Sequence, residues 1–318
     1  MFQGIIFALL ACCMWGFIFV VPQFIEGFHA FEVALARYFM YGIISLLLFA
    51  KNFLSTPRVY PRAIWYQAFL VAFIANIIYY TSVIMGLKYS TPAICALILG
   101  VSPIVTTLYA NSVHREHSFK KFIFPSVLIF FGLLIINFPH LQATEKVDSS
   151  LSYGFGLLAS IGGLLTWSWY VVVNANFLKR HPQISSSEWA TLVGVATLLV
   201  VLLCYLVLGV FLAEKQDFLR YRPSTTECKT LLVGASILAI FCSWLGSYFW
   251  NHASCLLPVT LAGQLTIFET IFGLIFVSIL EGQVPPVLDF FAILMILAAV
   301  IYGIFISSSN INLPKNLA

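Results

Sequence analysis

The sequence predicts an all-α integral membrane protein whose ten transmembrane helices form two inverted five-helix repeats. The first observation is composition: 61% of the 318 residues are hydrophobic and only 9% are charged. A soluble domain carries roughly 25% charged residues, so this chain cannot cover a water-facing surface. The second is a series of apolar runs of about 20 residues, the length that spans a bilayer core. These runs lack the alternating polarity of barrel strands, and lipid accepts only helices or closed barrels.

Charged residues and prolines divide the first half into five predicted spans. The first span contains no Lys or Arg, so a cleavable signal peptide is not indicated and we expect this span to be retained. Lys88 to Thr91 must form a tight turn, because Pro92 then starts the fourth span. The predicted spans are 3–24, 30–50, 63–87, 91–112 and 121–138.

The second half is again a series of five apolar runs. A charged linker over 139–151 separates it from the first half, and a loop over 213–229 with four basic and three acidic residues joins its second and third runs. Its predicted spans are 152–177, 187–212, 230–251, 258–280 and 287–308. We therefore divide one membrane domain into a first repeat (1–138), the linker (139–151), a second repeat (152–309) and a C-terminal tail (310–318).

The third observation is that landmark residues recur in the same order in both halves. Because five spans per half is an odd number, the second half must enter the membrane upside down relative to the first. Inverted repeats are a recurrent build of secondary transporters, with the substrate site between the repeats. The shared landmarks are Trp15 and Trp167, Pro92 and Pro258, and the closing acids Glu116 and Glu281.

The distribution of basic residues predicts the orientation. With the N-terminus inside, the cytoplasmic segments hold nine Lys and Arg residues and the outer segments hold six, four of them within 213–229. The positive-inside rule therefore predicts that both termini are cytoplasmic, in a bacterial inner membrane. The net charge of +4 is small and spread over loops, so it does not indicate nucleic-acid binding.

Glu269 lies in the middle of the ninth span and is the only acid so deeply placed. A charge at the bilayer centre costs on the order of 2.5–3.5 kcal/mol on insertion scales, so such residues mark solute or ion pathways by default. We interpret Glu269 as a proton-accepting carboxylate or as the counter-ion of a cationic solute. The alternatives are a structural pair with Arg37 or His252, or a protonated carboxyl bonded to a neighbouring helix.

Arg37 and a group of aromatic residues complete the candidate site. Arg37 lies well inside the second span, where it either binds a carboxylate bidentately, reaches back to the interface or neutralises Glu32. Aromatic rings at mid-span suit stacking or cation–π attraction, although each ring singly is more often a packing residue. The candidate residues are Glu269, Gln264, Trp15, Arg37, Tyr79, Tyr80, Trp167, Tyr170, Trp244 and Tyr248.

Several segments resemble the EamA type of the drug/metabolite transporter superfamily. They are Ala11 to Gly16, Ala36-Arg37-Tyr38, Gly86 to Ser90 and the stretch from Pro103 to Glu116. The resemblance covers nearly the whole chain, and it implies a ten-helix fold of two inverted bundles, small-metabolite transport and often export. The chain departs from the family pattern at Glu269, which stands where the first half has Pro103. The resemblance therefore does not name the substrate.

These observations predict a secondary transporter for a small organic metabolite or an amphiphilic or cationic solute, such as an amino acid, an amine or a drug-like molecule. We expect export by alternating access with Glu269 as the proton or cation site; the alternative is a passive facilitator or channel. Because nucleotide-binding, HExxH, GxSxG, CxxC and Cys/His ligand patterns are absent, we predict no enzyme, no catalytic residues, no metal and no cofactor. The predicted partners are the solute, protons and the lipid bilayer, and no feature of the sequence sets an oligomeric state.

Overall fold

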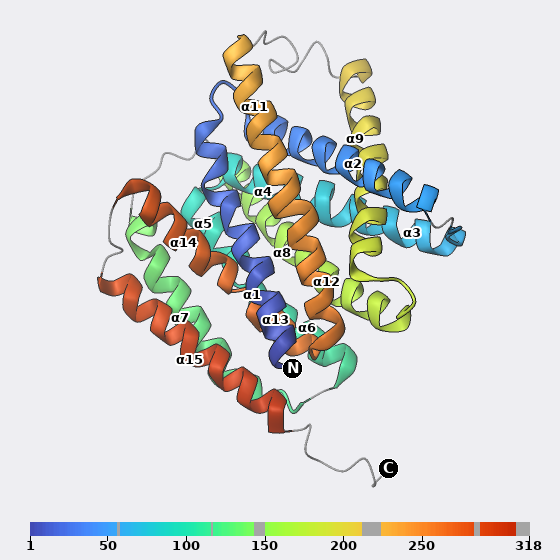
Figure 1. Cartoon of the computed structure of the whole chain (residues 1–318). Helices are drawn as coiled ribbons and strands as arrows, with labels where there is room; N and C mark the ends of the chain where they lie inside the picture. The colour runs from blue at the N-terminus through green and yellow to red at the C-terminus, as the bar shows by residue number, and fades with distance from the viewer. Residues whose placement is uncertain (56–57, 116, 143–149, 212–223, 283–286, 310–318) are drawn as a thin grey trace.

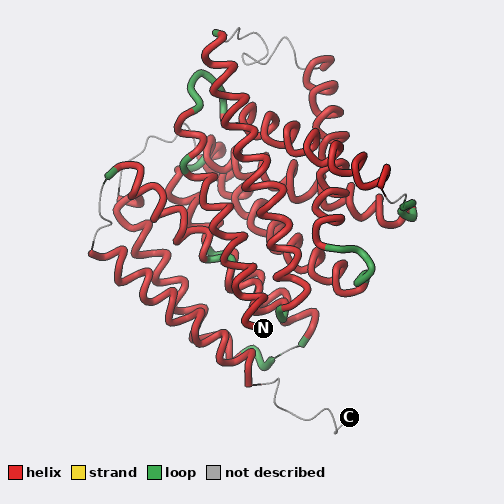
Figure 2. Tube along the Cα trace, in the orientation of Figure 1, coloured by secondary structure: helices red, strands yellow, loops and turns green. Residues whose placement is uncertain are grey.

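Helices make up the regular secondary structure throughout the computed structural model, which describes residues 1–318 except 56–57, 116, 143–149, 212–223, 283–286 and 310–318. Among the described residues, ten helical segments are long and apolar enough to cross a membrane. Figures 1 and 2 show them as one bundle of long, mutually tilted helices. The expectation of an all-α membrane protein with ten spans is confirmed.

The first five spans begin and end within a few residues of the predicted positions. The predicted tight turn after the third span is present, because α4 ends at Tyr89 and α5 begins at Pro92. The elements are α1 (Phe2–Gly16), η1 (Phe17–Phe19), η2 (Val21–Phe24), α2 (Ala30–Ser55), α3 (Arg62–Val71), η3 (Ala72–Ile78), α4 (Tyr79–Tyr89), α5 (Pro92–Gly100), α6 (Ser102–His114) and α7 (Lys120–Gln142).

The second half follows the prediction except at its eighth span. This span begins at Thr225 instead of 230, because Ser224 and Glu227 form a reciprocal capping box that starts the helix inside the predicted 213–229 loop. The elements are α8 (Ser150–Arg180), α9 (Ser186–Phe211), α11 (Thr225–Ile237), η4 (Leu238–Leu245), α12 (Gly246–Leu256), α13 (Val259–Leu265), α14 (Phe268–Glu281) and α15 (Val287–Ser309).

Some predictions fall on residues that the structure does not describe. They concern the closing acid Glu116, the central part of the 139–151 linker, most of the 213–229 loop and the 310–318 tail. At the edges of the linker, α7 continues to Gln142 and α8 already starts at Ser150, so its described ends are helical.

Four spans change their winding near the middle, at corresponding places in the two halves. The third and eighth spans contain the π-helical segments η3 and η4. The fourth span is interrupted at Val101, between α5 and α6, and the ninth at Thr266 and Ile267, between α13 and α14. Such irregularities inside helices occur frequently at functional sites. Their correspondence fits an internal repeat, while the inverted relation of the halves stays a prediction.

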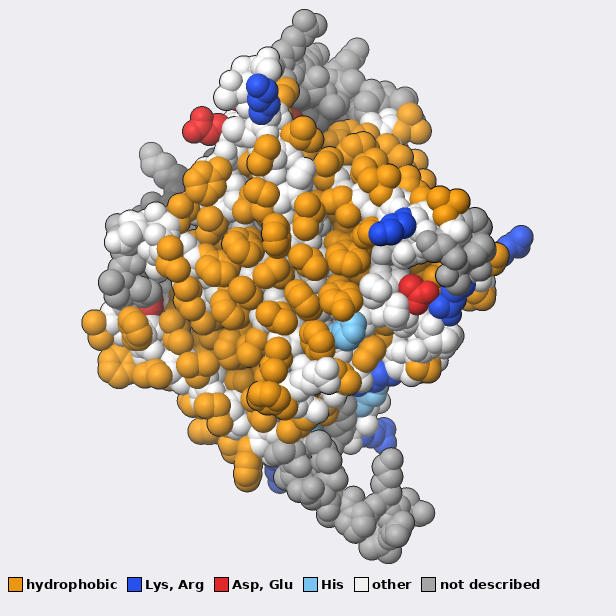
Figure 3. Space-filling view, in the orientation of Figure 1, with side chains coloured by type: hydrophobic (Ala, Val, Ile, Leu, Met, Phe, Trp, Pro, Cys, Tyr) orange, Lys and Arg blue, Asp and Glu red, His pale blue; other side chains and the backbone are white. Residues whose placement is uncertain are grey.

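Helices of the two halves pack against one another in pairs. α2 crosses α9, α7 packs along α15, α4 packs against α8, and α1 packs against α12 (Figure 1). One large hydrophobic cluster contains residues from both halves, so the two predicted repeats share a core. On the face shown in Figure 3, hydrophobic side chains cover the middle, and charged side chains lie toward the edges. This is the surface that a lipid bilayer requires.

The crossing of α2 and α9 depends on a close approach at Gly42. A Cβ atom added there would lie 2.8 Å from Leu198 Cα on the facing helix. We expect Gly42→Ala to destabilise the protein by about 1–3 kcal/mol, the usual cost of overpacking a core, and to lower the thermal unfolding midpoint in detergent. Gly154→Ala in α8 is the control, because a Cβ atom there meets no atom within 4 Å. Equal midpoints for the two variants would contradict this account of the crossing.

Candidate substrate-binding cavity

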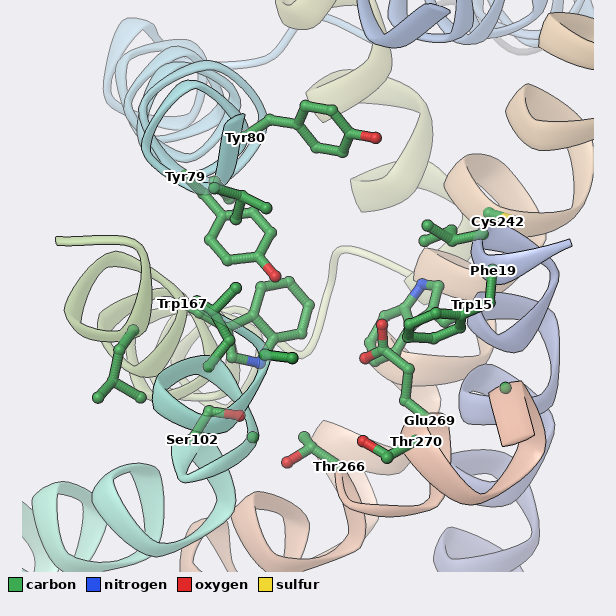
Figure 4. Close-up of a pocket in the computed structure, with 18 of the residues that line it drawn as sticks. Trp15, Phe19, Tyr79, Tyr80, Ser102, Trp167, Cys242, Thr266, Glu269 and Thr270 are labelled. Carbon is green, nitrogen blue, oxygen red and sulfur yellow. The ribbon is translucent and has the colours of Figure 1, made fainter. Parts of the chain in front are cut away.

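A cavity of about 690 Å³ lies in the centre of the bundle and is lined by residues of both halves. Figure 4 shows two facing walls: α4 and α8 present Tyr79 and Trp167, and α1 and α14 present Trp15 and Glu269. This volume falls within the roughly 300–1,000 Å³ that is typical of small-molecule sites.

Aromatic side chains form a connected cluster around Trp167. The Trp15 ring meets the Trp167 ring edge-on, with centroids 5.4 Å apart. Tyr79 and Tyr170 also pack on Trp167, with centroid separations of 5.2 and 5.4 Å. All four residues line the cavity. The two walls therefore meet at the contact of Trp15 with Trp167, and the cluster offers π faces and ring edges to a solute.

The Glu269 carboxylate faces this cavity and has no partner among the described residues. The residue lies in the first turn of α14, and its backbone N–H donates to the Thr266 carbonyl across the helix break. Its side chain makes no hydrogen bond and no ion pair with any described residue, and it is only partly buried because it faces the cavity. The structural pairs with Arg37 and His252 are thus not formed; the His252 ring packs on Phe7 instead. The positive end of the α14 dipole favours an anionic group at this position.

Arg37 reaches the same cavity but is anchored to its wall. Its Nε donates a hydrogen bond to Ser243 Oγ at 2.9 Å, and its guanidinium carbon lies 5.1 Å from the centre of the Tyr38 ring. Arg37 is 6% exposed and lines the cavity. It therefore neither reaches back to the interface nor neutralises Glu32. Two opposite charges, Arg37 and Glu269, share one cavity without pairing to each other.

Seven of the ten candidate residues line the cavity, and the other three lie elsewhere. Gln264 is buried in α13 and faces Gly303 of α15. Even a regular helix would turn it about 140° from Glu269, which lies five residues later. Trp244 donates to Thr191 Oγ1 at 3.2 Å and stacks on Tyr248, so these two rings form a contact of their own. The expectation that these three residues share the cavity does not hold. The residues that line it are Trp15, Arg37, Tyr79, Tyr80, Trp167, Tyr170 and Glu269.

Sequence reasoning missed small polar residues that line the cavity at the two helix breaks. Ser102 starts α6, and Thr266 and Thr270 flank the start of α14 (Figure 4). Pro103 was an available signal, because a proline within the first turn marks a helix start. The break at 266–267 contains neither proline nor glycine, so the sequence carries no comparable signal there.

The cavity lining extends toward one end of the bundle. At that end it reaches the exposed residues Phe19, Ala30 and Leu87. At the opposite end, α6 packs against α13, and Thr107 Oγ1 donates to the Thr260 carbonyl at 3.1 Å.

Polar contacts between helices close this opposite end further. Asn174 Nδ2 donates to Asn251 Oδ1 at 3.0 Å, which joins α8 to α12. Near the membrane surface, Arg58 pairs with Glu188 at 2.7 Å, and the Tyr60 hydroxyl donates to the same carboxylate. Burial, and then the hydrogen bond to Glu188, raises the pKa of Tyr60 to about 12, so this hydroxyl keeps its proton.

Ten apolar spans around a central cavity that holds two charged side chains fit a membrane transporter. Residues 2–138 match the EamA-like transporter family. The chain is 29% identical over 310 residues to Inner membrane protein YtfF of Escherichia coli (strain K12), covering 96% of this chain and 95% of that protein. It is 25% identical over 232 residues to Uncharacterized transporter YyaM of Bacillus subtilis (strain 168), covering 73% of this chain and 69% of that protein. These findings support an EamA-type protein of the drug/metabolite transporter superfamily.

A solved structure described as "Crystal structure of protein" shares the fold. Its TM-score is 0.73 at 16% sequence identity, and the match covers 96% of this chain and 98% of that chain. The ten apolar spans, the family match and the relative named as a transporter support a multi-pass membrane transporter and not an enzyme.

Proposed function

We propose that this transporter exports a small organic solute that carries a cationic nitrogen, and that Glu269 binds either this cation or a coupling proton. The observation that carries the proposal is the Glu269 carboxylate, which has no partner among the described residues and faces an aromatic cavity. A carboxylate supplies the counter-ion, and the faces of Trp15, Trp167 and Tyr79 supply cation–π attraction. Both interactions strengthen when the solute displaces water from the cavity.

A single carboxylate supports exchange of the solute for a proton. The proton and the cationic solute need the same oxygen atoms, so they bind one at a time. An inward proton gradient then drives the solute outward. This competition is the physical basis on which we propose export coupled to protons instead of passive flow.

Arg37 restricts which cations the cavity accepts. Its positive charge faces the same space, so a bare organic cation is repelled by one group while it is attracted by the other. A solute that carries both an amine and an acceptor oxygen satisfies both charges. Arg37 forms charge-assisted hydrogen bonds with such oxygen atoms. Amino acids and amino alcohols have this pattern, and we propose them as the favoured class.

We propose that the end of the cavity at Phe19 and Leu87 is external. The excess of Lys and Arg predicts cytoplasmic termini, and this orientation places the contacts of α6 with α13 on the cytoplasmic side. Transport then requires α6 and α13 to separate inside while α5 and α14 approach outside. The helix breaks at Val101 and Thr266 are the positions at which such a motion is accommodated.

A thermal-shift screen of the purified protein tests the substrate class. We expect amino acids or amino alcohols to raise the unfolding midpoint in a concentration-dependent way, because a ligand that binds only the folded state stabilises it by mass action. Matched carboxylic acids without the amine, and nucleobases, should not shift the midpoint. A shift with the deaminated acids alone would refute the assignment of a cationic nitrogen to the solute.

A further inference from the structure

A second hollow, separate from the central cavity, lies between the start of α3 and the end of α8. Its volume is about 610 Å³. We call it the α3–α8 groove. Its lining contains no Asp or Glu, and its polar side chains are hydrogen-bond donors or basic groups. The groove is lined by Arg62, Ala63, Ile64, Tyr66, Gln67, Val173, Asn176, Phe177, Arg180 and His181.

The positive charges of the groove are not neutralised by the protein. Arg62 and Arg180 are exposed, and neither forms an ion pair with a described residue. The nearby carboxylate of Glu188 forms its ion pair with Arg58 and not with Arg62 or Arg180. The start of α3 adds to the positive potential, because Pro61 offers no side-chain cap and the N-terminal end of a helix dipole is positive. An anionic group is therefore the complementary ligand.

The position of the groove relative to the membrane indicates the kind of anion. Arg62 is the first residue of one candidate membrane span and Arg180 the last residue of another, so we place both guanidinium groups at the depth of lipid headgroups. Tyr66 is exposed at the same level, as is typical of an interfacial aromatic. Further into the membrane, Val173 and Phe177 provide an apolar wall. A ligand with an anionic head and an apolar tail fits both parts of the groove.

We propose that the α3–α8 groove binds the headgroup phosphate of an anionic membrane phospholipid. Arg62 and Arg180 would contact the phosphate oxygens, and the Gln67 and Asn176 amides would donate to headgroup oxygens. A zwitterionic phospholipid fits less well, because its ammonium or choline group finds no carboxylate in the lining. Since α3 leads through η3 to Tyr79 and α8 carries Trp167, the lipid would join two helices that form one wall of the substrate cavity.

The experiment compares lipids and variants by native mass spectrometry of the detergent-purified protein, with unfolding midpoints as a second measurement. Wild-type protein should retain phosphatidylglycerol in preference to phosphatidylcholine. The double variant Arg62→Gln with Arg180→Gln should bind phosphatidylglycerol about 30-fold more weakly, because each basic side chain near an anionic lipid contributes about a factor of five. The double variant Lys120→Gln with Lys121→Gln removes the same charge from the start of α7 and should keep wild-type affinity.

Three results would overturn the proposal. The first is equal retention of phosphatidylglycerol and phosphatidylcholine by the wild-type protein, which needs no variant to fold. The second is unchanged phosphatidylglycerol affinity in a folded arginine double variant. The third is a midpoint shift by inorganic phosphate alone that matches the shift by phosphatidylglycerol, because this would assign the groove to a free anion.

Discussion

Glu269→Gln is expected to reduce solute transport by on the order of 100-fold while leaving the folded protein intact. The substitution keeps the shape of the side chain and removes its charge and its exchangeable proton. Loss of one partner of a desolvated charge pair costs about 2–5 kcal/mol, which corresponds to a factor of about 30 to a few thousand. Folding should not suffer, because no described residue loses a partner and a neutral amide is cheaper to place in a membrane than a carboxylate.

The measurement is solute uptake into proteoliposomes that contain the transporter in inside-out orientation, with and without an imposed pH gradient. Wild-type transport should respond to the gradient, and the residual transport by the Gln variant should not. Glu281→Gln is the matched control, because Glu281 is an exposed acid at the far end of the same helix. If Glu269→Gln transports at the wild-type rate with the same response to the gradient, Glu269 is a structural residue and the proposed function fails.

A disulfide between α6 and α13 is expected to stop transport reversibly. A Cβ atom at Gly263 would lie 3.2 Å from Thr107 Oγ1. A sulfur atom and the partner Cβ are separated by about 3 Å across a disulfide bond, so the pair Thr107→Cys with Gly263→Cys has suitable geometry. Because alternating access requires these helices to separate, the oxidised double variant should fall to background transport, and a reductant should restore it.

The controls for the cross-link are the two single variants under the same oxidation. The native cysteines are present in all three proteins, so any effect that these thiols cause will appear in the single variants as well. The cross-linked protein should still bind solute through the end of the cavity at Phe19 and Leu87. Retained binding distinguishes a folded transporter that cannot change conformation from an unfolded protein. Full transport by a completely cross-linked protein would show that α6 and α13 stay together throughout the cycle.

The sequence was sufficient for the spans because membrane insertion depends on length and apolarity, which are local properties. Pro92 and Pro258 marked the starts of their spans through another local property, because the backbone of proline suits the start of a helix. The eighth span was predicted to start too late, since Glu227 and Lys229 were interpreted as loop charges although Ser224 and Glu227 begin a helix. It also continues to Leu256, beyond the predicted end at 251.

Site residues were harder to predict because side-chain direction depends on helix breaks. Glu269 and Trp15 were found from depth alone, since any charged or aromatic residue at mid-span is conspicuous. Gln264 was included on the same ground, but it faces α15, since five residues turn a helix by about 140° from the side of Glu269. Trp244 lies in a π-helical segment, where the periodicity of a regular helix no longer predicts which way a side chain points.

The π-helical segment Ala72–Ile78 immediately precedes Tyr79 and Tyr80 in the chain. A π-helical turn takes up about one residue more than an α-helical turn, so every side chain after it is rotated by about 100° relative to a regular helix. The direction in which the Tyr79 side chain points is therefore set by the preceding π-helical segment and not by the tyrosine itself. Loss of one residue from this segment would keep both tyrosines in the sequence and turn them away from the solute. We therefore expect a one-residue deletion within Ala72–Ile78 to change the shape of the cavity wall although every residue of that wall is unchanged.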